Sequence, residues 1–264
     1  MSTKKDKFSI KDKLYMGLAL DLAKSREGHT GSNPSVGCVI VKDDKIISIG
    51  QTSLNGRPHA EYNAIKNCHE EIQGSKMYVT LEPCCHHGKT SPCTSSIINS
   101  KLSEVIYSIK DIDKRVSGKS KKILNSKKII VKTGLLKQQV TQFYESYFYN
   151  RKYRLPFVTG KIAESKNNVI YSKGNKRITN KSSDNLTHLL RYKNDSIMVS
   201  YKTLNKDNSK LNARIKKFKN FTPKRVILDN ELNLNTKSYL FKTVKKNNTI
   251  VFYNNADKSK IKEF

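Results

Sequence analysis

A histidine and two cysteines, each in a distinctive local context, constrain this 264-residue chain more than any other feature. His59 is followed two residues later by Glu61, and Cys84 and Cys93 each come directly after a proline. One imidazole and two thiolates can hold a catalytic zinc ion and leave its fourth position for water. Glu61 is close enough in sequence to face that water without coordinating the metal, so we expect it to act as the general base. The pattern therefore predicts an open catalytic zinc centre.

Other interpretations of these residues remain open at this point. A His-x-Glu pair also arises by chance on solvent-facing surfaces, and a fourth ligand from Cys85, His86 or His87 would make the site structural. Cys38 lies in an apolar strand and Cys68 on a helix, and we expect both to be packing residues. The order strand, Pro-Cys, loop, Pro-Cys, helix favours catalysis, because zinc deaminases combine His-x-Glu with proline-preceded cysteines.

The net charge of +29 raises the competing hypothesis of a nucleic-acid partner. The lysines are scattered through every segment, with no arginine-rich arm and no interleaved aromatic platform, so we attribute the charge to a background lysine bias. An RNA or free-base zinc deaminase and a non-catalytic zinc-stabilised binding module remain the alternatives. No run approaches the ~18 apolar residues of a membrane span, and the start of the chain lacks a signal peptide's apolar core. We therefore expect a cytoplasmic chain with no membrane partner.

Strands alternate with helices along both halves of the chain, which predicts an α/β architecture. In the first half, helices are expected at 11–27, 60–68, 93–100, 119–125 and 135–149, and strands at 36–41, 46–49, 77–81, 104–109 and 128–132. Residues 150–156 have the composition of a linker. In the second half, we expect strands at 156–163, 196–200, 225–228 and 249–253, and a helix at 182–193. Two domains follow, residues 1–150 and 151–264.

The spacing of the two cysteines indicates which deaminase this chain resembles. Eight residues separate them, whereas the generic zinc deaminase has two. Residues 81–93 (LEPCCHHGKTSPC) resemble, nearly residue for residue, the signature of the bifunctional deaminase/reductase family of riboflavin biosynthesis. Residues 33–41 (NPSVGCVIV) match that family's upstream substrate loop and strand. The resemblance covers essentially all of residues 1–150.

The resemblance implies a fold and a reaction. The fold is a cytidine-deaminase-like three-layer α/β/α domain, followed by an incomplete dihydrofolate-reductase-like α/β reductase domain. The reaction is hydrolysis at a cyclic amidine, in which 2,5-diamino-6-(5-phosphoribosylamino)pyrimidin-4-one becomes 5-amino-6-(5-phosphoribosylamino)uracil. The partner is then a small phosphoribosyl pyrimidine rather than a nucleic acid. The oligomeric state stays open, although folds of this kind often form homo-oligomers through their helices.

The same resemblance assigns roles within the first half. His59, Cys84 and Cys93 would be the zinc ligands, and Glu61 the proton shuttle. Asn33 would hydrogen-bond the base, since a carboxamide both donates and accepts, although an asparagine before a proline is also a common turn residue. Lys89 would help to hold the substrate, within reach of its phosphate. One departure is visible at 111–114, where the family commonly shows Asp-Pro-Asn-Pro and this chain has DIDK.

Downstream, the family carries a reductase that uses NADPH to open the ribose ring, and residues 157–163 resemble its first strand. The resemblance assigns cofactor contacts to Ala163, Thr203 and Asp207. It assigns substrate and phosphate contacts to Lys161, Thr179, Arg191, Leu211 and Arg214. Without the order of the motifs, the lysine and arginines of this set would be interpreted as ordinary solvent-exposed surface residues. The family's Ser-Leu-Asp-Gly turn is SKNN at 165–168, and no counterpart of its late glycine-rich, phosphate-cradling stretch follows. We therefore expect this chain alone to reduce little or nothing.

Overall fold

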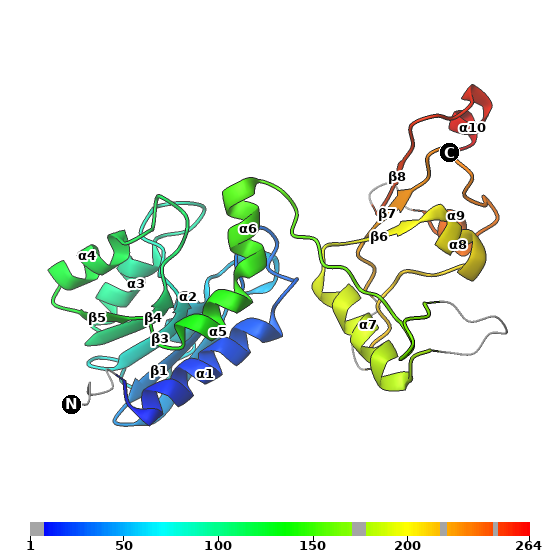
Figure 1. Cartoon of the computed structure of the whole chain (residues 1–264). Helices are drawn as coiled ribbons and strands as arrows, with labels where there is room; N and C mark the ends of the chain where they lie inside the picture. Colours follow the sequence, from blue (N-terminus) through cyan, green and yellow to red (C-terminus); the bar gives the residue numbers. More distant parts are fainter. Residues whose placement is uncertain (1–7, 171–177, 217–220, 245–247) are drawn as a thin grey trace, which may run out of the picture. The chain divides into compact units, whose positions relative to one another are not determined.

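The computed structural model describes residues 8–170, 178–216, 221–244 and 248–264. Residues 1–7, where the sequence predicts no signal peptide, lie outside the described residues. The chain divides into two compact units, Met1–Thr159 and Gly160–Phe264 (Figure 1). The division falls nine residues after the boundary expected at 150, and each unit is described by itself.

A five-stranded mixed sheet forms the middle layer of the first unit (Figure 1). Its strands are β1 (Gly37–Lys42), β2 (Lys45–Gln51), β3 (Lys76–Leu81), β4 (Glu104–Ile109) and β5 (Ile130–Thr133). In the order β2-β1-β3-β4-β5, β1 pairs antiparallel with β2 and β3, and β3, β4 and β5 run parallel. All five strands predicted in this half are confirmed, with shifts of at most two residues at their ends.

Helices cover both faces of this sheet. They are α1 (Ile10–Ser25), α2 (Ala60–Lys66), α3 (Cys93–Asn99), α4 (Lys119–Ser126), α5 (Lys137–Phe143) and α6 (Glu145–Tyr153). Because strand residues alternate between faces, two cores form. Val39 and Tyr78 pack with Met16 of α1 on one side, whereas Ile40 and Val79 belong to the core that includes residues of α2, α3 and α4. This is the three-layer α/β/α arrangement that the sequence predicts.

The start of α2 is held against the sheet by a glycine. A Cβ on Gly50 of β2 would lie 2.2 Å from the carbonyl oxygen of Ala60 and 2.5 Å from the backbone nitrogen of Ala64. Only glycine therefore allows the helix to approach this closely. The contact positions the first turn of α2, which carries Glu61.

The single helix expected at 135–149 is wrong, because the chain forms α5 and α6 with a break at Tyr144. The Tyr144 ring is buried, and its hydroxyl donates to the Ser35 carbonyl oxygen at 2.8 Å and lies 2.7 Å from Thr80 Oγ1. These long-range hydrogen bonds fix the tyrosine in the core. Helix α6 then starts in a new direction and runs to Tyr153, into the segment predicted to be a linker.

The second unit contains a smaller parallel sheet of order β6-β7-β8 (Figure 1). Its strands are β6 (Ser196–Ser200), β7 (Lys224–Leu228) and β8 (Thr249–Phe252). Its helices are α7 (Lys181–Lys193), α8 (Tyr201–Asp207), α9 (Tyr239–Lys242) and α10 (Lys258–Glu263). The three strands and α7 confirm the prediction. The other three helices are too short to show helical periodicity in the sequence.

The strand predicted at 156–163 is wrong. The segment contains no strand, and the side chains of Val158 and Ile162 are 80% and 75% exposed. Strand propensity depends on packing against a neighbouring strand, and none of the described strands pairs with this segment. An apolar run alone was therefore insufficient evidence for a strand.

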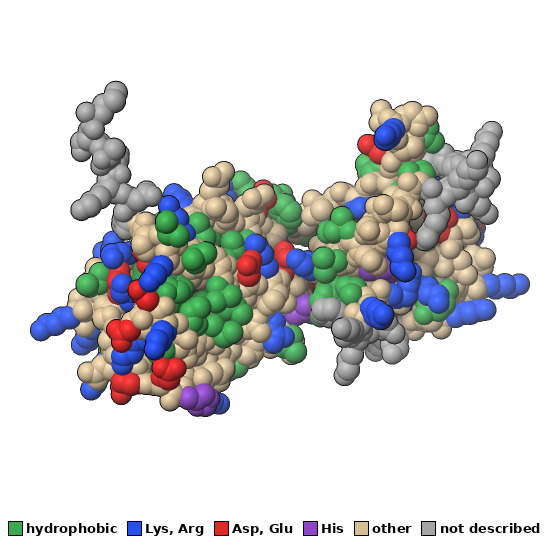
Figure 2. Space-filling view, turned by 90° about the horizontal axis from the view of Figure 1, so that it is seen from below, with side chains coloured by type: hydrophobic (Ala, Val, Ile, Leu, Met, Phe, Trp, Pro, Cys, Tyr) green, Lys and Arg blue, Asp and Glu red, His purple; other side chains and the backbone are tan. Residues whose placement is uncertain are grey.

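On the face drawn in Figure 2, several Lys and Arg side chains gather on the second unit. Lys and Arg side chains are spread over both units, with Asp and Glu among them on the first unit (Figure 2). Among the described residues, no helix has the length and apolar character needed to cross a membrane.

Candidate active site

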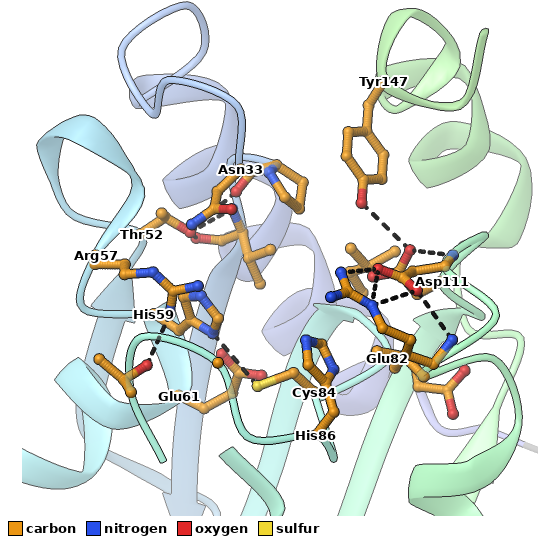
Figure 3. A pocket seen from close by; sticks show the side chains of 18 of the residues that line it. Asn33, Thr52, Arg57, His59, Glu61, Glu82, Cys84, His86, Asp111 and Tyr147 are labelled. Atoms are coloured by element: carbon orange, nitrogen blue, oxygen red, sulfur yellow. Dashed lines mark hydrogen bonds and ion pairs between the residues drawn. The ribbon is translucent and has the colours of Figure 1, made fainter. Parts of the chain in front are cut away.

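Three potential metal ligands meet at the ends of two helices and a strand. His59 is the residue before α2, Cys93 is the first residue of α3, and Cys84 lies in the loop after β3. His59 Nδ1 is 3.5 Å from Cys84 Sγ and 3.4 Å from Cys93 Sγ. All three ligand atoms lie within 4.8 Å of one another, and Figure 3 shows two of these residues, His59 and Cys84. The structure thus brings together the residues that the sequence predicts as ligands.

The spacing of these atoms fits a tetrahedral zinc ion. Zinc bonds of about 2.0–2.3 Å at tetrahedral angles place nitrogen and sulfur ligands roughly 3.6 Å apart, close to the two separations observed. In the described part of the chain, no fourth histidine, cysteine or carboxylate joins the group. Cys85 instead points its thiol at the Arg115 carbonyl oxygen, at 3.5 Å. The geometry therefore matches a site with one position open to water, and the structural-site alternative is not supported.

The surroundings of the sulfurs stabilise negative charge on Cys84. Hydrogen bonding from Cys93, and then from His59, lowers the pKa of the Cys84 thiol to about 4. One of these donors is the backbone N–H of Cys93, 3.3 Å from Cys84 Sγ at the start of α3. The N–H group at the start of α3 thus helps to stabilise thiolate charge on Cys84.

Glu61 occupies the first turn of α2 beside this group (Figure 3). Its side chain is 3% exposed, and burial raises the pKa of its carboxyl above the ordinary value, against the opposing charge of His59. A carboxyl whose protonated and ionised forms are closer in energy can accept and return a proton more readily. The position and environment both fit a proton shuttle.

Asn33 lines the same pocket and is held there by a glycine that the sequence analysis missed. Its side-chain NH₂ donates to the Gly56 carbonyl oxygen at 2.8 Å. Gly56 has φ of 89°, and a Cβ there would lie 2.8 Å from Asn33 Cβ and 2.4 Å from the Thr30 carbonyl oxygen. The place of Asn33 in the pocket wall therefore depends on glycine at position 56.

Lys89 is exposed and lies on a loop of which other residues, Gly88 and Thr90, line the pocket. A cation that the structure does place in the lining near this loop is Arg57, whose Nη1 donates to Thr90 Oγ1 at 2.7 Å. No local sequence signal marks Arg57, since its contact with Thr90 spans 33 residues.

The opposite wall comes from the loop after β4 and from α6 (Figure 3). The Tyr147 hydroxyl donates to Asp111 Oδ1 at 3.3 Å, and the guanidinium of Arg151 lies 5.4 Å from the centre of the Tyr147 ring. Burial raises the pKa of the Asp111 carboxyl. Asp113 and Arg115 line this wall as well. The sequence therefore identified the altered 111–114 segment but not the contribution of α6.

The buried carboxylate of Glu82 fastens that wall to the sheet. Its Oε2 accepts from the Gly118 backbone nitrogen at 3.0 Å, and its Oε1 accepts from Ser120 Oγ at 2.6 Å. Glu82 follows β3 directly, so these bonds tie the end of the strand to the start of α4. Sequence reasoning treated this residue only as part of a signature.

In the second unit, four of the eight residues expected to bind NADPH or substrate line one cavity: Arg191, Asp207, Leu211 and Arg214. Arg191 is partly buried, donates to the Asn212 carbonyl oxygen at 3.2 Å, and has an unpartnered buried Nε. The remaining four, Lys161, Ala163, Thr179 and Thr203, are not among the residues of this cavity. The structure thus assembles part of the expected set and leaves part outside.

Comparison with known proteins identifies relatives for both units. The cytidine and deoxycytidylate deaminase zinc-binding region matches residues 9–109, and the RibD C-terminal domain matches residues 167–264. A diaminohydroxyphosphoribosylamino-pyrimidine deaminase from Buchnera aphidicola (Schizaphis graminum) is 42% identical over 147 residues, which are 56% of this chain and 100% of that protein. Riboflavin biosynthesis protein RibD of Haemophilus influenzae is 33% identical, with 89% of this chain and 67% of that protein covered.

The solved structures agree. The crystal structure of a deaminase/reductase from Thermotoga maritima matches with a TM-score of 0.83 and 33% identity, over 92% of this chain and 70% of that one. The chain spans only 63%, 66% and 60% of the RibD proteins of Aquifex aeolicus, Actinobacillus pleuropneumoniae and Bacillus amyloliquefaciens. The similarity therefore extends over most of this chain and about two thirds of these relatives.

Proposed function

The chain belongs to the RibD family of riboflavin-biosynthesis proteins, and on that premise we propose that its first unit is a zinc-dependent hydrolytic deaminase. The substrate is the diaminopyrimidinone that carries a phosphoribosylamino group, and the products are the corresponding aminouracil and ammonia. The observation that carries the proposal is the convergence of His59, Cys84 and Cys93 at a pocket that His59, Cys84 and the buried Glu61 line. The Buchnera relative is named as this deaminase, and the match of 147 residues covers the whole length of that relative.

The residues of the pocket divide the chemistry among them. His59, Cys84 and Cys93 would hold zinc, which when bound supplies a Lewis acid that lowers the pKa of a coordinated water towards ~7. Glu61 takes one proton from the attacking water and delivers it to the ring nitrogen. It then carries the second proton to the departing amine, so that C–O forms, C–N breaks and ammonia leaves. Asn33 fixes the ring by hydrogen bonding to its edge.

The wider proposal concerns partners and location. The partner is a small phosphoribosyl pyrimidine, with no nucleic acid and no membrane, and the location is the cytoplasm. Self-association into a homo-oligomer is compatible with this chemistry, since every residue assigned to the deaminase step comes from one chain. The charged side chains of both signs that line the pocket suit a polar nucleotide better than an apolar ligand.

For the second unit, we propose that this chain by itself reduces little or no substrate with NADPH. Only four of the eight residues expected to contact NADPH or substrate line one cavity. Lys161 and Ala163 lie in a segment that forms no strand, so a β-strand does not align them. A test is NADPH oxidation by the purified chain with the deaminated product, and an ordinary enzymatic rate would refute this proposal.

The deaminase proposal is tested by substrate choice. The zinc-loaded chain is incubated separately with the phosphoribosyl diaminopyrimidinone and with transfer RNA, and ammonia is measured. We expect release from the nucleotide and none from the RNA. Release from RNA alone would make the chain a nucleic-acid deaminase instead.

A further inference from the structure

Resting on the proposed deaminase, we propose that Arg115 is a specificity-determining residue that Asp113 holds in place. Its guanidinium donates hydrogen bonds to oxygen atoms of the substrate's phosphoribosyl group. Both residues line the pocket wall at which this chain departs from the Asp-Pro-Asn-Pro pattern.

The two side chains form a tightly connected pair. Arg115 Nε lies 3.0 Å from Asp113 Oδ1 and 3.1 Å from Oδ2, and Arg115 Nη2 lies 2.5 Å from Oδ2. The backbone nitrogen of Arg115 also donates to Asp113 Oδ1, at 2.9 Å. Nη1 makes no hydrogen bond within the described residues, so its two N–H groups are available to a ligand.

The backbone beneath this pair is anchored on both sides. Asp111 Oδ1 accepts from the Asp113 nitrogen at 3.0 Å, and Glu82 accepts from the Gly118 nitrogen further along. The Arg115 carbonyl oxygen accepts from the Cys85 thiol at 3.5 Å. A guanidinium held on an anchored loop loses less conformational freedom when it binds a ligand.

The depth of the pocket decides which part of the substrate Arg115 meets. Glu61, where the amine must react, is 3% exposed, whereas the Arg115 side chain is 68% exposed, and both residues line the same pocket. A base bound at Glu61 therefore directs its phosphoribosyl substituent towards the outer wall. The oxygens of that substituent are acceptors, which a guanidinium matches.

The departure at position 113 explains why an arginine is needed. An asparagine amide donates as well as accepts, whereas an ionised aspartate only accepts. The Arg115 guanidinium holds the pKa of the Asp113 carboxyl at about 2, so this residue offers no donor of its own near neutral pH. Arg115 supplies the missing donor and offsets the negative charge that would otherwise repel a phosphate.

The test compares KM and kcat of four variants with those of the wild type. Arg115→Ala should raise KM by about 10- to 100-fold with kcat changed less than twofold, because a charged hydrogen bond to the non-reacting part of the substrate is lost. Asp113→Ala, which frees the arginine, should raise KM less. The double variant D113N/R115A should recover most of the loss, because the amide again provides a donor. Lys114→Ala removes the same charge from an exposed neighbour outside the pocket lining and should change nothing.

An unchanged KM in Arg115→Ala, or an equal rise in Lys114→Ala, would overturn the proposal, and failure of the double variant to recover would overturn the donor replacement. The dephosphorylated nucleoside distinguishes the ribose hydroxyls from the phosphate as the acceptors that Arg115 contacts. If Arg115→Ala still raises KM for the nucleoside, the contact is to ribose hydroxyls, and if the effect disappears, the contact is to phosphate. Binding is also measured by calorimetry in the Glu61→Gln background, with and without Arg115→Ala. This readout keeps the inference testable if the wild type releases no ammonia, an outcome that would refute the proposed function alone.

Discussion

The sheet of the first unit is covered by helices on both faces, whereas the sheet of the second unit leaves large apolar side chains in contact with solvent. In the first unit, Tyr78 and Ile106 are 1% exposed. In the second, Met198, Ile250 and Phe252 are 59%, 47% and 57% exposed. The two units also differ in how far their expected site residues come together. A buried core fixes the helices and strands that carry the deaminase residues. The first unit buries its central strands and exposes apolar side chains only at its edges, such as Ile130 of β5 at 58%. The assembled ligand set lies in this unit, and the partly assembled set of expected reductase residues lies in the other.

The largest expected effect is on the metal cluster, the feature that most separates the units. Cys84→Ser should lower the zinc content and reduce ammonia release to below about one-hundredth of wild type, since even outer-shell partners of a metal contribute 10- to 100-fold. Cys68→Ser, a matched change at a cysteine outside the cluster, should retain both. Zinc content by atomic absorption and ammonia release provide the check. Full activity in Cys84→Ser would contradict the proposed ligand set.

A matched pair of isoleucines tests the packing difference directly. Ile106 of β4 is 1% exposed and Ile250 of β8 is 47% exposed. Ile106→Ala should cost about 2–5 kcal/mol of unfolding free energy, as buried truncations do, and Ile250→Ala below about 1 kcal/mol. Urea unfolding followed by signals from each unit measures both. Equal losses would mean that the two sheets are packed alike, and the comparison would fail.

Two glycines with positive φ separate a steric role in the site from a purely local one. Gly56→Ala should cost about 1–3 kcal/mol of stability and raise KM, because the new Cβ collides with Asn33 and the Thr30 carbonyl oxygen. Gly74, with φ of 80° and no atom within 4 Å of an added Cβ, provides the control. Gly74→Ala should cost about 1 kcal/mol and leave KM unchanged. An unchanged KM in Gly56→Ala would show that Asn33 does not depend on this glycine.

The smallest expected effect concerns the tyrosine that ends α5. Tyr144→Phe removes the hydroxyl that bonds Ser35 and Thr80 and should cost about 1–2 kcal/mol. Thermal unfolding of the variant measures this loss. Tyr153→Phe, at an exposed position of α6, should be neutral. If Tyr144→Phe leaves the stability unchanged, the hydrogen bonds of this hydroxyl do not explain the break between the two helices.

Much of the first unit was predictable because its signals are local. His59, Glu61, Cys84 and Cys93 carry their chemistry in short, spaced motifs, and the strands of the sheet are compact β-branched runs. Arg57 and Tyr147 were not predictable in the same way, since tertiary folding alone brings them to the pocket. The break at Tyr144 depends on a contact with Ser35, 109 residues away.

In the second unit the same reasoning was less reliable. The apolar run at 156–163 resembles a strand but is unpaired in the described structure, because pairing is a property of neighbours rather than of the segment. Arg191 and Arg214 could be expected at a common cavity only through resemblance, since isolated cations in a basic chain usually face solvent. Where few long-range contacts fix the fold, local patterns predict the elements better than their assembly.

The most direct test of the deaminase account is ammonia release from the phosphoribosyl diaminopyrimidinone by the zinc-loaded chain and its Glu61→Gln variant. Both proteins are first shown to contain equal zinc and to unfold alike. The account predicts steady release by the wild type and loss of turnover in the variant, because the amide cannot carry the proton. Equal rates in the two proteins would contradict the assignment of Glu61 as the proton shuttle and, with it, the proposed mechanism.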